Sequence, residues 1–576
     1  MTLGRILVWW SLLVTLGAAV LAAQSAVPTG LPGTVEGRVS NAVTGEPVAG
    51  ASVHLFPFGR RGATGSQAQT AVTQRDGIFH FDSVPRGTYF LIAGADGYVT
   101  TRGRLRGERL VVDSGQQITD VAVQLTPQGS ISGKVLDENG QAVPGARVEA
   151  YTTYVMRGKL QLRRGNSATA NEAGEYTLKK LNPGKYYLSA DSALSKESSK
   201  QSQEPALEEA GKKKPTVAND VGYVRTFYPS GLDVQSATPF ELTSGQQGAG
   251  ADIRLKRAMT YRVQGKVAAD GGMRVATVLL SPRGTLDANV LGASTHVAKD
   301  GTFELKDVLP GSYTLWLIGT YSPEQVSPRH YAGFRLLARQ DVDVTASNIN
   351  GIVLSLTPPV NLTGHITAEG IDKQRLAQVR VNLVPSGDVM MGSFQSAAVD
   401  QDGNFAVQNL SPGTYSVRVS NSPAGTYVKE VDYNRQDITI DGLDASLGGG
   451  GEVDIVIRSG AGEVNGTVQS DSSETGNPAT IVVLVPDNVA ADGYGTLTGP
   501  VSGNAFTIRN VPPGHYYAYA IGQWESAWQS VDFLREIQRA GTSIDVRENA
   551  RVQVELPVLA PDDLEGARAR LGFSAP

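Results

Sequence analysis

The chain has 576 residues, a formal net charge of -5 and no cysteine, and 19% of its residues are charged. Its length suggests about four to six domains of roughly 100–150 residues each. The cysteine count excludes disulfides, cysteine nucleophiles, thiolate metal sites and a lipid-bearing cysteine, and the acidic balance argues against nucleic acid as a partner.

Residues 1–24 are predicted to be a signal peptide. Arg5 supplies the positive charge, residues 6–21 are apolar apart from two hydroxyl residues, and Ala22 and Ala23 follow as small residues. The alternative is an uncleaved membrane anchor, although the apolar run is slightly short for a span. We therefore expect export to the periplasm, the outer membrane or the medium, with no transmembrane span in the mature chain.

A strand signature of the form Gly-x-Val or Gly-x-Ile, with apolar neighbours at alternate positions, occurs five times. Its glycines are Gly37, Gly133, Gly265, Gly364 and Gly466. Self-similarity at a regular spacing indicates tandem copies of one structural unit.

A second signature follows each of these strands. It consists of a turn, an alternating strand, a second turn with Pro and Gly, and a tyrosine; the tyrosines are Tyr89, Tyr186, Tyr313, Tyr415 and Tyr516. The separation between the strand glycine and the Pro-Gly glycine varies only from 46 residues (Gly265 to Gly311) to 51 residues (Gly133 to Gly184). We expect each tyrosine to place its ring in a core and to bond its hydroxyl to the backbone, rather than to form a binding stripe.

Each repeat closes on a further alternating strand, such as Val453, Ile455 and Ile457. Short strands of period two between regular turns predict an all-β tandem array of five antiparallel β-sandwich modules. The expected modules are repeat 1 at 33–126, repeat 2 at 127–257, repeat 3 at 258–357, repeat 4 at 358–458 and repeat 5 at 459–560, with a tail at 561–576.

Two segments depart from the strand pattern. Residues 191–220 are rich in Lys, Glu and Ser, and we expect a disordered insertion in repeat 2 because so little apolar area is available to offset ordering. Phe533, Leu534 and Ile537 fall at helical spacing, which predicts one short helix over 530–540 that covers repeat 5.

The strand glycine, the Asp-Gly turn and the Pro-Gly-x-Tyr segment together resemble the carboxypeptidase regulatory-like domain family. The segments Thr44–Val53 and Asn139–Val148 strengthen the resemblance, which covers about residues 33–560 and is closest in repeats 1 and 2. It implies a transthyretin-like (prealbumin-like) sandwich, a fold grouped with starch-binding-like and adhesin B-type domains. In bacterial exported proteins, such modules are accessory parts beside peptidase domains or outer-membrane receptors.

The sequence contains no recognisable catalytic constellation. None of the six histidines belongs to a His-x-x-Glu or His-Glu-x-x-His motif, and neither a Gly-x-Ser-x-Gly elbow nor a phosphate-binding loop is present. His80, His365 and His515 align with outward polar positions of the other repeats, so we expect them on the surface. The sequence predicts no catalytic residue, no cofactor and no metal site.

Repeat 5 differs from the other repeats in its aromatic content. Alternation places Tyr516 on the core face of its strand and Tyr517 and Tyr519 on the outer face, and Trp524 and Trp528 follow closely. These four outer aromatics, Tyr517, Tyr519, Trp524 and Trp528, are a candidate binding site for carbohydrate or peptide. The alternative is that the helix near 530–540 covers and buries them.

These observations predict a non-catalytic exported protein of the cell envelope that acts as a structural or interaction array, with adhesive or spacer modules. The alternative is a carbohydrate-binding protein with starch-binding-like modules, and a remote alternative is an accessory protein to a peptidase or an outer-membrane receptor. The expected partner is an envelope protein or a polysaccharide of unknown identity.

Overall fold

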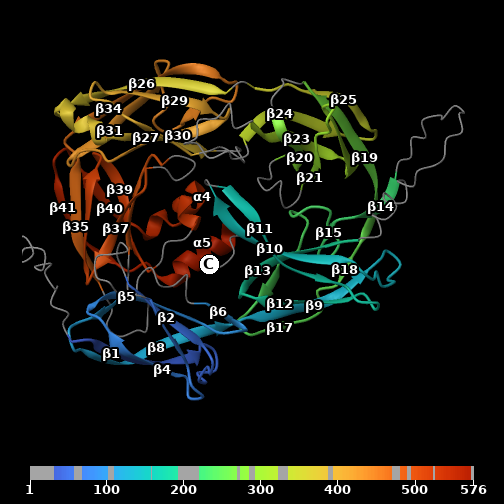
Figure 1. Cartoon of the computed structure of the whole chain (residues 1–576), viewed down its shortest axis with the longest axis horizontal. Helices are drawn as coiled ribbons and strands as arrows, with labels where there is room; N and C mark the ends of the chain where they lie inside the picture. Colours follow the sequence, from blue (N-terminus) through green and yellow to red (C-terminus); the bar gives the residue numbers. More distant parts are fainter. Residues whose placement is uncertain are drawn as a thin grey trace, which may run out of the picture. The chain divides into compact units, whose positions relative to one another are not determined.

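The computed structural model describes residues 31–57, 68–100, 109–156, 159–192, 220–268, 273–283, 292–321, 335–357, 359–386, 394–469, 481–489, 495–522 and 526–571. The predicted signal peptide and nearly all of the 191–220 insertion lie outside these ranges. The described elements are almost all strands (Figure 1), which confirms the all-β prediction. The chain divides into two compact units, Met1–Pro127 and Gln128–Pro576.

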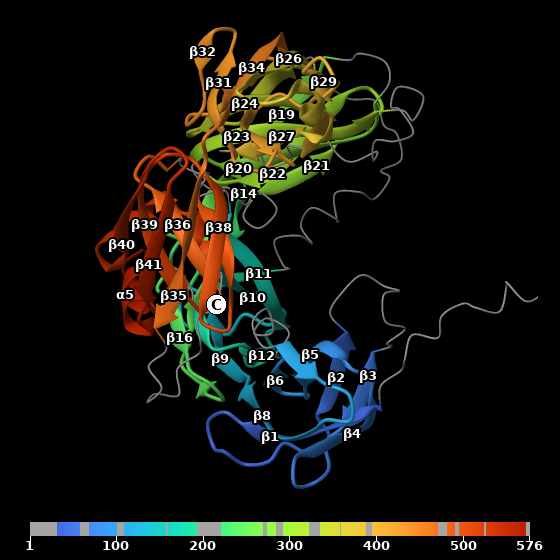
Figure 2. The ribbon, with the colours of Figure 1, turned by 90° about the vertical axis from the view of Figure 1, so that its left-hand side faces the viewer.

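Repeat 1 has two four-stranded sheets, ordered β4-β1-β8-β6 and β3-β2-β5-β7, which Figure 2 shows as separate layers. Alternate side chains of both sheets meet in one core between them. The strands are β1 (Gly33–Asn41), β2 (Ser52–Pro57), β3 (Gln69–Val72), β4 (Ile78–Val84), β5 (Gly87–Gly94), β6 (Tyr98–Val99), β7 (Arg109–Val112) and β8 (Gln117–Pro127).

Repeat 2 has the same two layers, with a longer second sheet. The first sheet contains β9 (Gly129–Leu136), β12 (Glu175–Leu181), β17 (Gln247–Gly248) and β18 (Ile253–Arg254). The second sheet contains β10 (Arg147–Met156), β11 (Lys159–Thr169), β13 (Gly184–Asp191), β15 (Thr226–Phe227) and β16 (Phe240–Leu242).

The first sheet of repeat 3 includes a strand from the range that the sequence assigned to repeat 2. β14 (Asp220–Val224) pairs antiparallel with the start of β19 (Lys256–Val267), so the two repeats share a strand pairing. The rest of that sheet is β22 (Thr302–Val308) and β25 (Ile349–Leu354), and the second sheet is β20 (Met273–Pro282), β21 (Ala293–His296), β23 (Gly311–Tyr321) and β24 (Arg335–Val344).

Repeat 4 has a five-stranded sheet and a four-stranded sheet around one core. The first contains β26 (Val360–Glu369), β29 (Asn404–Leu410), β31 (Thr426–Tyr433), β32 (Gln436–Asp437) and β34 (Gly449–Ser459). The second contains β27 (Arg380–Ser386), β28 (Gln395–Ala398), β30 (Thr414–Ser420) and β33 (Leu443–Asp444), and a 3-10 turn, η4 (Lys373–Gln378), precedes β27.

In repeat 5 the two layers are continuous, because β37 pairs with β38 and joins all seven strands into one sheet. These strands are β35 (Gly462–Gln469), β36 (Ile481–Pro486), β37 (Leu497–Ser502), β38 (Ala505–Val511), β39 (Gly514–Ile521), β40 (Thr542–Val546) and β41 (Arg551–Pro557). The helical elements are η5 (Ser526–Gln529), α4 (Val531–Glu536), η6 (Gln538–Ala540) and α5 (Pro561–Leu571). The helix expected near 530–540 is therefore present, and the expected tail contains a second helix.

The sheets are mostly antiparallel, as expected, and every repeat also contains a parallel pairing. The first strand pairs antiparallel with the strand before the Pro-Gly turn, but it pairs in parallel with the closing strand of the same repeat. The closing strand thus returns beside the first strand in the same direction, which holds the two ends of each repeat together.

The strand glycine lies directly opposite an aromatic residue in every repeat. In repeat 3, a Cβ atom on Gly265 would lie 2.5 Å from the carbonyl oxygen of Ile352 and 2.6 Å from the ring of Phe303. The glycine therefore leaves room for the closing strand and for the ring that packs across it. The pairs are Gly37 with Phe79, Gly133 with Tyr176, Gly265 with Phe303, Gly364 with Phe405 and Gly466 with Phe506.

The tyrosine after each Pro-Gly turn forms the predicted corner. Its ring lies in or against the core, and its hydroxyl donates to the carbonyl oxygen four residues earlier. The five bonds run from Tyr89 to Pro85 (2.7 Å), Tyr186 to Asn182 (2.7 Å), Tyr313 to Leu309 (2.9 Å), Tyr415 to Ser411 (2.6 Å) and Tyr516 to Pro512 (2.8 Å). Burial raises the pKa of Tyr186 to about 12, so this donor keeps its proton at neutral pH.

The second-to-last residue of the strand before the Pro-Gly turn is left-handed in repeats 2 to 5. The residues are Lys180, Asp307, Asn409 and Asn510, with φ between 56° and 59°. Lys carries the larger steric cost, roughly 1–2 kcal/mol, in this conformation, whereas Asn adopts it more readily.

Lys180→Gly is expected to stabilise repeat 2 by about 0.5–1 kcal/mol, because the relief of strain exceeds the extra entropy of glycine in the unfolded chain. Thermal denaturation measures the change, and Asn409→Gly is the control, with a smaller effect. A lower melting temperature for Lys180→Gly contradicts the expectation.

Candidate functional site

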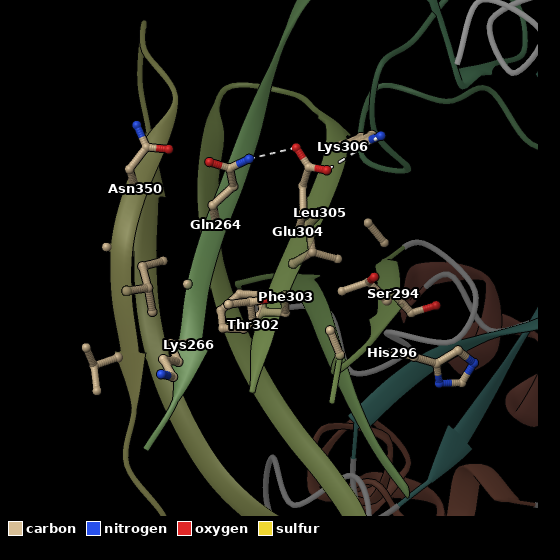
Figure 3. Close-up of a pocket in the computed structure, with 17 residues that line it drawn as sticks. Gln264, Lys266, Ser294, His296, Thr302, Phe303, Glu304, Leu305, Lys306 and Asn350 are labelled. Carbon is tan, nitrogen blue, oxygen red and sulfur yellow. Dashed lines mark hydrogen bonds and ion pairs between the residues drawn. The ribbon is translucent and has the colours of Figure 1, made fainter. Parts of the chain in front are cut away.

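An open groove of about 910 Å³ lies on repeat 3, where the polar outer face of the first sheet meets the edge strand β21 of the second (Figure 3). Gln264 and Lys266 come from β19, and Glu304 and Lys306 come from β22. The other polar residues of the lining are Ser294, Thr295, His296, Thr302 and Asn350. The buried ring of Phe303 lies beneath it.

Glu304 is the centre of the polar contacts in this groove. Its Oε1 accepts from Gln264 Nε2 at 2.7 Å and from Arg262 at 3.2 Å, and its Oε2 lies 3.5 Å from Lys306 Nζ. Partial burial acts to raise the pKa of Glu304, but the Gln264 bond and the charges of Lys306 and Arg262 outweigh it and hold the pKa below its ordinary value. The carboxylate is therefore ionised at neutral pH and held in a fixed orientation.

The groove offers hydrogen-bonding groups rather than a reacting pair. His296 bonds to Thr277 at 3.2 Å and points away from Glu304 in Figure 3, so it does not form an acid–base couple with that carboxylate. Lys266 and Gln264 present a cation and an amide on the same strand. Such a lining suits recognition of a polar ligand.

Repeat 5 has a smaller depression at the same place. It is lined by Asn465, Thr467, Thr507 and Glu555, from β35, β38 and β41. Asn465 and Thr507 occupy the cross-strand positions of Gln264 and Glu304, so the ionic centre of the repeat 3 groove is absent from this depression.

The aromatic cluster predicted in repeat 5 does not form an exposed surface from its described members. Tyr519 and Trp528 are 2% and 0% exposed, and Tyr517 is half-buried. Tyr519 does lie on the outer face of its strand, as alternation predicts. The ring centroid of Trp528 lies 5.4 Å from that of Tyr519 and 5.7 Å from that of Phe533 in α4. The helix covers these rings, as in the alternative from the sequence, and Trp524 lies outside the described residues.

A second candidate surface is the outer face of the β3-β2-β5-β7 sheet in repeat 1. Phe56, Val72 and Val111 are 39%, 60% and 55% exposed there, beside half-buried Phe90 and Ile92. In repeat 5 the equivalent face carries Val483, Val485 and Ile521 and is covered by the chain's own helices. An apolar face of this kind is typical of a protein interaction surface.

In repeat 2, the equivalent outer face of the second sheet holds a buried cluster of charged residues. Glu149 accepts from the hydroxyl of Tyr151 at 2.5 Å and pairs with Arg147 at 3.0 Å and Arg164 at 3.5 Å. Burial raises the pKa of Tyr151, so the hydroxyl remains a donor. The cluster fixes the base of the β10–β11 hairpin.

The three histidines that the sequence placed on the surface lie there. His80 contacts Glu36 and Asp82, and His365 bonds to Asn404. The hydrogen bond with Asp545 raises the pKa of His515. Within the described ranges, no group of three metal-ligating side chains gathers closely enough to hold an ion, and no helix there is long and apolar enough to cross a membrane.

Residues 34–126 and 130–216 match the family model of the carboxypeptidase regulatory-like domain. Repeats 1 and 2 thus resemble this domain, as expected. The two ranges include the Thr44–Val53 and Asn139–Val148 segments. The other three repeats share the glycine–aromatic pair and the tyrosine corner with them.

Colossin-A of Dictyostelium discoideum is 23% identical over 394 residues, which is 63% of this chain but 3% of that protein. The minor pilin GBS52 of Streptococcus agalactiae shares 14% identity, covers 39% of this chain and 96% of its own, and has a TM-score of 0.22. BcpA, the major pilin subunit of Bacillus cereus, shares 12% identity, covers 56% and 99%, and has a TM-score of 0.16. Because both TM-scores are low, the two pilins give no information about what this chain binds.

The groove has a signal in the sequence that the strand pattern alone did not reveal. Once Gly265 is paired with Phe303, Gln264 must lie opposite Glu304 on the outer face. The register of the glycine–aromatic pair therefore locates the polar centre of the groove.

Proposed function

We propose that the chain is an exported, non-catalytic interaction array of the cell envelope, whose sandwiches serve as adhesive surfaces and spacers. One observation carries the proposal: the same sandwich, with its own core, glycine–aromatic pair and tyrosine corner, recurs along the chain. Repetition of a rigid unit multiplies surface and reach. Export is supported by the N-terminal pattern around Arg5.

The partner that the structure favours is a protein, because the exposed face of repeat 1 is apolar and aromatic rather than charged. Phe56, Val72 and Val111 are the residues through which repeat 1 would contact it.

Affinity capture from envelope fractions, with the mature chain as bait, tests this function. We expect the chain to capture a defined partner, and the double variant Phe56→Asp, Val72→Asp to lose it. Val43→Asp is the control, because Val43 is exposed in a turn outside this face, and this variant should retain the partner. A mature chain that binds neither an envelope protein nor an envelope surface would contradict the proposed function.

A second candidate function, carbohydrate binding, is favoured by the groove of repeat 3, whose amide, hydroxyl and charged groups resemble those that bind sugar hydroxyls. A glycan screen with wild type and Gln264→Ala distinguishes it. Loss of a glycan signal in Gln264→Ala but not in Thr507→Ala of repeat 5 supports it, and the absence of any signal removes it.

A further inference from the structure

The β10–β11 hairpin of repeat 2 extends well beyond its own sheet. β10 pairs with β13 only as far as Tyr151, opposite Tyr187, whereas its pairing with β11 continues to Met156, opposite Lys159. The last residues of β10, beyond Tyr151, therefore have one neighbouring strand instead of two. A two-stranded ribbon on its own is marginally stable in water.

The projecting part of the hairpin is nevertheless buried on one face. Thr153, Val155 and Leu162 are 8%, 3% and 7% exposed, and the cross-strand register places them on the same side. Leu162 is covered within repeat 2, by Tyr151 and Phe227. Val155, which lies nearer the hairpin tip, belongs to a different hydrophobic cluster.

The element that covers Val155 belongs to repeat 5. Val155 is part of the hydrophobic cluster under the helices of that repeat, together with Tyr519, Ala527, Trp528 and Phe533. Figure 1 shows the hairpin beside α4 and α5. The outer faces of the two repeats thus meet through a β-branched apolar residue, while the Glu149 cluster fixes the base of the hairpin.

We propose that this hairpin is an intramolecular latch that joins repeat 2 to repeat 5 and closes residues 128–576 into one body. The latch goes beyond the proposed function, because it sets how far the array can extend. While the latch is closed, Trp528 and Ala527 are shielded; when it opens, the repeats can separate and the apolar cluster of repeat 5 is exposed to water. Tension along the chain would favour the open form, since that form is longer.

The chain contains no cysteine, so a single introduced pair reports on the latch. In the mature chain, Val155→Cys combined with Ala527→Cys is expected to form an intramolecular disulfide under mild oxidation, detected by faster migration on a non-reducing gel. Thr152→Cys with Ala527→Cys is the matched control, because Thr152 lies on the opposite face of β10. Equal crosslinking in both variants, or none in the first with an unchanged circular dichroism spectrum, overturns the latch.

Disulfide-linked dimers in dilute solution would mean that the hairpin docks on a second copy, which overturns an intramolecular latch. Val155→Asp, with its circular dichroism spectrum preserved, should increase the radius of gyration by small-angle scattering, whereas Thr152→Asp should not. An unchanged radius for folded Val155→Asp also contradicts the proposal.

Discussion

Replacing Gly265 with Val is expected to destabilise repeat 3 by about 3 kcal/mol or more, at the upper end of the cost of overpacking a core. Even a single added Cβ would lie 2.5 Å from the carbonyl oxygen of Ile352 and 2.6 Å from the ring of Phe303. The backbone carbonyl cannot move aside without breaking the parallel pairing of β19 with β25. Thermal or chemical denaturation of the mature chain measures the loss.

Lys266→Val is the matched control for Gly265→Val. It introduces the same side chain at the next position of β19, where the residue points outward and is exposed, so its effect should stay within about 0.5 kcal/mol. Comparable destabilisation by the two variants would mean that the glycine does not maintain the close approach of the strands.

Tyr415→Ala is expected to destabilise repeat 4 by about 3–5 kcal/mol, because it empties a fully buried aromatic site. Tyr415→Phe keeps the ring and removes only the hydrogen bond to the Ser411 carbonyl, which leaves that acceptor unpaired at a cost of about 1–3 kcal/mol. The order of melting temperatures should be wild type, Phe, then Ala. A Tyr415→Ala protein that melts with the wild type would place the ring outside the core.

The sequence predicts the sandwiches well because their side-chain pattern and their turns are local. Alternation identifies the inward residues of β19 and β22, and the turn before Tyr313 fixes the corner. The same alternation is blind to strand direction, so it could not distinguish the parallel closing strand from an antiparallel one. The pairing of β14 with β19 could not be predicted either, because a pairing between two repeats produces no local sequence pattern.

The candidate sites were harder to predict because exposure depends on what covers a face. Alternation correctly predicts that Tyr519 lies on the outer face, yet α4 and α5 cover that face. The sequence predicts a tail at 561–576, whereas residues 561–571 form α5. Asp562, Asp563 and Arg570 are exposed on this helix, and Ala567 is buried. Position on a strand is a local property, whereas burial is a property of the assembled chain.

Each repeat carries its own core, maintained by a glycine–aromatic pair and a tyrosine corner. Hydrogen exchange of the intact mature chain, comparing wild type with Gly265→Val by mass spectrometry, tests it most directly. We predict faster exchange in peptides from β19, β22, β23 and β25, with the strands of repeats 1 and 4 as protected as in wild type. Loss of protection spread evenly over all repeats, or no change within repeat 3, would contradict the account.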